Sequence, residues 1–114
     1  SAAEKELREA LERSPSDVDL HMKLGVLLQE QGRYPSALRE FHFVERHRPN
    51  NPMMLFHTGM TFHQMGQCNS AVRYLGRFVR DPRVNSHPQK KREAIAVMDT
   101  CGGDRPPLRR GRER

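Results

Sequence analysis

Apolar residues recur at helical spacing along two neighbouring stretches of the chain. The first stretch carries Leu20, Leu24, Leu27 and Leu28. Gly32 follows it as a helix stop signal. The second stretch opens at Tyr34-Pro35-Ser36, with proline in a first turn where it is tolerated, and ends at Pro49. Its apolar positions are Ala37, Leu38, Phe41 and Val44. The pattern predicts two helices joined by a short turn.

The same pattern returns 34 residues later along the chain. Glycines and alanines recur at this offset as Gly25 with Gly59, Gly32 with Gly66, and Ala37 with Ala71. Apolar positions recur as Leu28 with Phe62, Phe41 with Leu75, and Val44 with Phe78, and the series extends back to Ala3 and Leu7. A fixed period of this length is typical of stacked structural repeats. Glycine inside a helix costs about 1 kcal/mol relative to alanine, so its repetition indicates close approach of two helices.

These residues resemble the pattern of the tetratricopeptide repeat (TPR) family, over about residues 3–101. The matching positions in the first unit are Leu24-Gly25, Gly32, Tyr34, Ala37, Phe41 and Pro49, and those in the second are Thr58-Gly59, Gly66, Cys68, Ala71, Leu75 and, one residue early, Pro82. The family's tryptophan is replaced by His21 and Leu55. The resemblance implies an all-α fold, a right-handed superhelical stack of antiparallel helix pairs (an α-solenoid) of about five helices.

The repeat register divides the chain into five segments. Residues 1–15 would form the second helix of an incomplete leading repeat, residues 16–50 the first full repeat, and residues 51–83 the second. A capping helix would occupy residues 84–101, with a polar outer face that keeps a terminal repeat in solution. Residues 102–114 would form a flexible basic tail. Because the chain begins at Ser1 and not at methionine, an excised piece of a longer array is one interpretation.

Composition and charge exclude some classes of function. The chain carries a net charge of +6, and residues 104–114 hold five arginines against two acids. This arginine-rich part has no aromatic residue for base stacking, so we do not expect nucleic-acid binding. No apolar run approaches the roughly 20 residues of a membrane-spanning helix, so we do not expect membrane insertion.

The resemblance also suggests how the two cysteines are related. Cys68 would begin the second helix of repeat two, and Cys101 would end the capping helix. Adjacent helices of such a stack are antiparallel, so both residues should meet at one rim, and we predict a disulfide. Two buried free thiols are the alternative. A disulfide would favour an extracytoplasmic location, either secreted or in a bacterial periplasm; free thiols would favour the cytoplasm.

The family resemblance implies a concave groove, lined by the first helix of each repeat, that binds a peptide or helix of a partner protein. The groove positions in repeat one are Asp19, Met22, Lys23, Val26, Gln29 and Glu30, and those in repeat two are Met53, Phe56, His57, Met60, His63 and Gln64. We expect Phe56 and Met60 to be apolar anchors, with His57, His63 and Lys23 giving polar selectivity. Met22 and Val26 occupy positions of the Lys/Asn carboxylate clamp, which argues against that mode. Alternatively, some of these residues pack beneath a neighbouring helix.

Other functions find weaker support in the sequence. Met53, His57 and Met60 could accept a soft metal such as copper, but His57 and His63 diverge by about 240° around the helix axis. We therefore expect no metal and no other cofactor. No catalytic motif is present in the sequence, so we do not expect an enzyme. Self-association through the unpaired first helix, giving a homo-oligomer, remains an alternative to groove binding.

Overall fold

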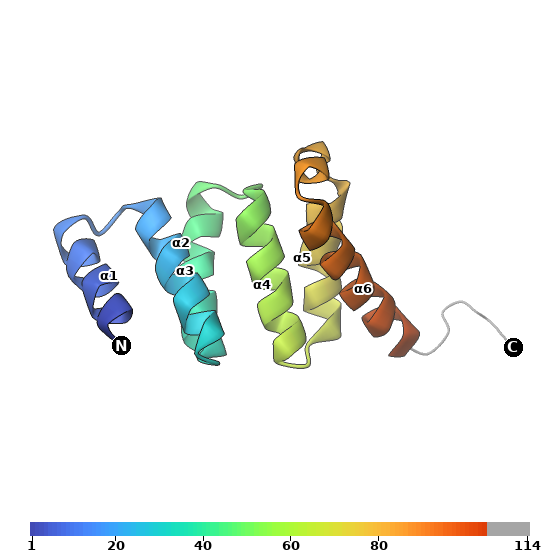
Figure 1. Cartoon of the computed structure of the whole chain (residues 1–114), viewed down its shortest axis with the longest axis horizontal. Helices are drawn as coiled ribbons and strands as arrows, with labels where there is room; N and C mark the ends of the chain where they lie inside the picture. Colours follow the sequence, from blue (N-terminus) through green and yellow to red (C-terminus); the bar gives the residue numbers. More distant parts are fainter. Residues whose placement is uncertain (105–114) are drawn as a thin grey trace, which may run out of the picture.

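The computed structural model describes residues 1–104, which form six α-helices and one short 3-10 helix. The elements are α1 (Ala2–Arg13), α2 (Val18–Glu30), α3 (Tyr34–His47), α4 (Pro52–Gln64), α5 (Cys68–Arg80), η1 (Pro82–Ser86) and α6 (Pro88–Asp104). Consecutive helices stand side by side and alternate in direction, so that the chain advances along one axis (Figure 1). The predicted all-α stack is confirmed, with one α-helix more than the expected number.

The first helix of each repeat starts and ends in the same way, as the repeated sequence predicts. The carboxylate of Asp17 accepts a hydrogen bond from the Leu20 amide at the start of α2, and the side chain of Asn51 does the same for Met54 at the start of α4. Such side-chain caps satisfy amides that have no partner inside the helix. Gly32 and Gly66 follow α2 and α4 with φ of 77° and 78°, a left-handed conformation that glycine adopts without steric cost. The two turns therefore have the same geometry.

The glycines inside α2 and α4 allow each helix to approach its partner closely. A Cβ atom at Gly25 would lie 2.5 Å from Cε1 of Phe41, and one at Gly59 would lie 2.6 Å from Cγ of Leu75. Phe41 and Leu75 are fully buried, so neither could move aside without disturbing the core. The prediction of close helix–helix approach at these positions is confirmed.

Two clusters of buried side chains form the interior. The first joins α2 to α3 and consists of Leu24, Leu28, Ala37, Leu38 and Phe41. The second, toward the carboxyl end, consists of Val44, Met54, Leu55, Phe56, Leu75, Phe78, Val84 and Ala94. Met22 packs against both clusters and so connects them. Neighbouring repeats are therefore in apolar contact with each other, as stacked units require.

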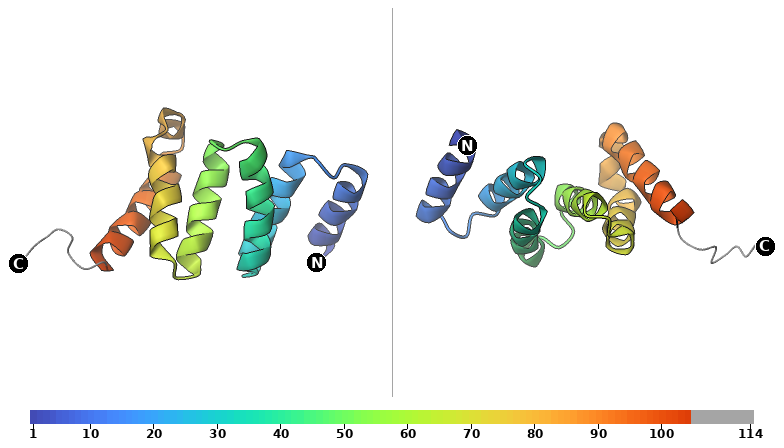
Figure 2. Two further views of the ribbon diagram at one scale, coloured as in Figure 1. Left: turned by 180° about the vertical axis from the view of Figure 1, so that it is seen from behind. Right: turned by 90° about the horizontal axis from the view of Figure 1, so that it is seen from below.

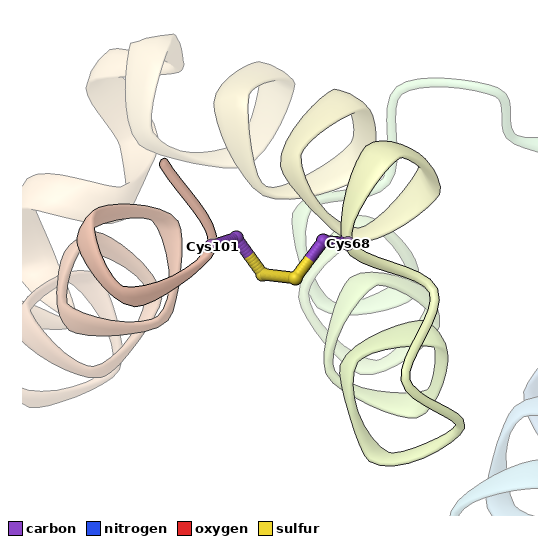
Figure 3. The surroundings of a disulfide bond; sticks show 2 residues. All are labelled: Cys68 and Cys101. Atoms are coloured by element: carbon purple, nitrogen blue, oxygen red, sulfur yellow. A yellow bond between two sulfur atoms is a disulfide. The ribbon is translucent and has the colours of Figure 1, made fainter. Parts of the chain in front are cut away.

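A disulfide between Cys68 and Cys101 fastens α6 to α5, as predicted. Their Cα atoms lie 5.4 Å apart, which is within the usual range for a disulfide. Figure 3 shows the bond joining the first turn of α5 to the last part of α6. These two helix ends lie side by side because the helices run in opposite directions. Cys101 is fully buried. The bridge thus fixes the position of α6, which covers part of the second cluster.

The last helix continues beyond the expected boundary. It extends to Asp104, so residues 102–104, which we assigned to a tail, belong to α6. Residues 105–114 lie outside the part of the chain that the structure describes. No helix within residues 1–104 has the length and apolar character needed to cross a membrane.

Candidate functional site

A shallow depression of about 250 Å³ is lined by residues of α2, α4 and α6. The two views in Figure 2 place α4 between α2 and α6. Seven predicted groove residues line the depression: Val26, Gln29, Glu30, Phe56, His57, Met60 and Gln64. Tyr34 from α3 and Glu93 from α6 complete it. Residues of two repeats and of the final helix are thus brought to one place.

The other predicted groove residues lie outside this depression. Asp19 is 71% exposed and pairs with Arg48, whose Nη1 lies 3.0 Å from the carboxylate. Met22 and Met53 pack against the buried clusters. Lys23 is exposed and His63 is partly buried. These five residues surround the depression or support it, and none of them lines it.

The structure corrects the expected role of Phe56. Only 5% of this residue is exposed, and its ring centroid lies 5.2 Å from that of Phe78. The ammonium of Lys90, on α6, lies 6.0 Å from the centroid of the same ring. Phe56 is therefore part of the floor and not a projecting anchor, because α6 packs over it. Met60 is more exposed and presents the accessible apolar contact.

Three neutral polar side chains form a hydrogen-bonded row across the floor. Nδ1 of His57 donates to Oε1 of Gln29 over 3.1 Å, and Nε2 of Gln29 donates to Oε1 of Gln64 over 3.0 Å. Gln29 is buried, so the two bonds satisfy an amide that would be costly to leave unpaired. The row links α2 to α4. It holds the His57 ring in the tautomer that carries the proton on Nδ1.

Sequence reasoning missed Tyr34 and Glu93 as lining residues. Tyr34 matched a family position at the start of α3, but that position is not in a first helix and we did not assign it to the groove. In the sequence, Glu93 belongs only to the polar face of the capping helix expected over residues 84–101. The sequence gives little indication of this position for Glu93. The residues of α6 do not repeat those found 34 positions earlier, so the repeat pattern does not assign Glu93 to the groove. Only the packing of α6 against α4 and α5 brings Glu93 to the depression.

A family model described as the tetratricopeptide repeat matches residues 1–41 and 23–67. Together these matches cover more than half of the 114 residues. The chain belongs to the tetratricopeptide repeat family. A search of curated proteins finds no match.

Membership of the TPR family assigns a general function to this chain, that of a protein-interaction scaffold. In such stacked repeats the surface contacts, and not the fold itself, decide what is bound. Within the described part of the TPR array, no group of three or more His, Cys, Asp and Glu side chains could hold a metal ion.

Burial holds His57 uncharged at neutral pH. Loss of solvation and, to a smaller extent, the positive charge of Lys90 lower the pKa of this histidine from 6.5 to about 4. The imidazole thus adds no charge to the floor of the depression at pH 7.

Acidification is expected to destabilise the array through His57. Between pH 6.5 and about 4, the unfolded chain binds a proton at this residue that the folded chain does not. The free energy of unfolding should therefore fall as the pH is lowered, by at most about 1.4 kcal/mol per pH unit. Urea unfolding at pH 7, 6 and 5 measures this slope. The His57→Gln variant has no titrating group at this position, so equal slopes in both proteins would contradict a buried, neutral His57.

Proposed function

We propose that this TPR array binds an extended or helical segment of a partner protein along the face formed by α2, α4 and α6. It acts by recognition and not by catalysis. The observation that supports this proposal most strongly is the convergence of seven predicted groove residues on one depression over α4. Its apolar part consists of Val26, Phe56 and Met60. Met60 would be the central anchor, because methionine adapts its shape to irregular apolar partners.

The residues around the depression would give polar selectivity. His57 and Gln64 offer hydrogen-bonding groups on α4, and Glu30 offers a carboxylate at the end of α2. Lys23 and His63 lie on the same two helices, outside the depression. A segment longer than the depression would reach them.

Placing a charge at the proposed anchor tests this function. We expect Met60→Asp to weaken partner binding at least about 30-fold, since an unpaired carboxylate would be buried at the centre of the contact. The measurement is quantitative capture of partner proteins from native lysate, with circular dichroism to verify unchanged helicity. Ile95→Asp is the matched control, because Ile95 is 41% exposed and lies on α6 outside the depression. Unchanged capture by Met60→Asp would show that the groove assignment is wrong.

Self-association through α1 finds less support in the described residues. Leu7 and Leu11 are partly buried against the first core cluster, so the apolar face of α1 already has a partner in the chain. Ile95, on α6, is the one large hydrophobic residue within the described part of the chain that is strongly exposed. No apolar patch on α1 thus favours a second copy.

We also propose that the protein resides outside the cytoplasm. The supporting observation is the disulfide between Cys68 and Cys101, since disulfides persist in oxidising compartments. Intact mass after alkylation of the protein in its native cells, without reductant, tests this location. Two alkylated cysteines would contradict it.

A further inference from the structure

Two carboxylates line the depression from helices on either side of α4. Glu30 is the last residue of α2, and Glu93 lies in α6. Both side chains are exposed, and neither forms an ion pair within residues 1–102. No lysine or arginine lines the depression. The ammonium of Lys90, three residues before Glu93 in α6, lies 6.0 Å from the centroid of the Phe56 ring.

The lining residues between these carboxylates carry no charge. Val26, Phe56 and Met60 contribute apolar surface, and Gln29 and Gln64 contribute paired amides. His57 is neutral because burial lowers its pKa to about 4. The only formal charges among the lining residues at neutral pH are therefore negative.

Taken together, the geometry points to a lysine or arginine side chain of the bound segment as the occupant of this depression, with its cationic group between Glu30 and Glu93. This inference rests on the proposed function, because it names the residue type that the groove selects. The long alkyl stem of such a side chain packs on apolar surface while its head stays near water.

Other side chains fit this depression less well. An acidic side chain would be repelled by both glutamates. A purely apolar side chain would fill the floor but would remove water from the two carboxylates without replacing its hydrogen bonds. A cation with an alkyl stem meets both requirements, and this complementarity of charge and shape carries the assignment.

A random 12-residue peptide library displayed on phage is the probe for this inference. The 114-residue chain is used to select binders, and the leading peptide is synthesised for fluorescence polarisation. We expect one lysine or arginine to be enriched at a fixed distance from an apolar residue. Replacing that basic residue by norleucine, which keeps the stem and removes the charge, should weaken binding about tenfold. An enriched set with no basic position would overturn the inference.

Variants of the protein complete a double-mutant cycle with the peptide. The Glu30→Gln/Glu93→Gln protein should bind the basic peptide about tenfold more weakly and the norleucine peptide as wild type does. Glu6→Gln/Glu9→Gln, on the exposed surface of α1, changes the net charge equally and should have no effect. Equal losses for both peptides in the groove variant would overturn the inference, since the carboxylates would then not act on the cation.

The Met60→Asp variant separates this inference from the proposed function. If Met60→Asp abolishes binding of the selected peptides while the glutamine variant binds them normally, the groove is correct and the cation assignment is wrong. If no peptide is selected, or Met60→Asp binds all of them, both proposals are wrong. If removal of residues 105–114 strengthens peptide binding, the arginine-rich segment of the chain itself competes for the site, and the assignment to a partner is overturned.

Discussion

Replacing Cys68 and Cys101 by serine is expected to lower the free energy of unfolding by roughly 3 to 4 kcal/mol. The bridge joins residues separated by 33 positions, and a loop of this length restricts the unfolded chain strongly in the chain-entropy description. A loss of this size is a large fraction of the stability of a small domain. Urea unfolding followed by circular dichroism measures it.

Reduction of the wild-type protein provides the matched control. A dithiol reductant should destabilise the wild type by a similar amount and leave the double serine variant unchanged. Hydrogen exchange should show the largest loss of protection in α6, because the bridge is the covalent link between this helix and α5. A wild type whose stability is unaffected by reductant would contradict the stapling role.

Phe41→Ala is expected to be at least as destabilising, by about 3 to 5 kcal/mol. Phe41 is fully buried, and its ring lies against Gly25 of the paired helix. Truncation would leave a cavity where the two helices of the first repeat approach most closely. Urea unfolding measures the decrease in the free energy of unfolding. Phe41→Leu, which keeps an apolar side chain there, should cost less than about half as much.

The contact with Gly25 allows a sharper form of this test. Gly25→Ala alone places its Cβ against the Phe41 ring and should destabilise the protein. In the Phe41→Ala background the same methyl group enters the cavity, so its cost should vanish or change sign. Residues in contact show such non-additive changes, and distant residues do not. Additive effects of the two substitutions would contradict the close approach at this position.

Much of the fold follows from the sequence because the sequence repeats. The pairs Gly25/Gly59 and Gly32/Gly66 indicated both the close contacts and the turns, since only glycine meets these requirements without steric cost. The disulfide could be predicted once the antiparallel order of helices was assumed, because that order alone brings the first turn of one helix beside the last turn of the next.

The candidate site was predictable only in part, because α6 lies outside the regular repeat. Its position decides that Phe56 is buried and that Glu93 reaches the depression. Helical periodicity places a residue on a face of its own helix, but it does not indicate which neighbouring helix covers that face. The same limit applies to Asp19. Its position in a first helix predicted a place in the groove, but its carboxylate pairs with Arg48, which follows α3.

Photo-crosslinking tests most directly whether the partner occupies the face formed by α2, α4 and α6. A photoreactive benzoylphenylalanine is introduced in place of Met60 in one variant and in place of His42 in another. Met60 lines the depression, whereas His42 is exposed on α3 and does not line it. Irradiation in native lysate, followed by mass spectrometry, is predicted to give a covalent partner adduct from position 60 and none from position 42. Adducts from position 42 with none from position 60 would contradict the groove as the binding surface.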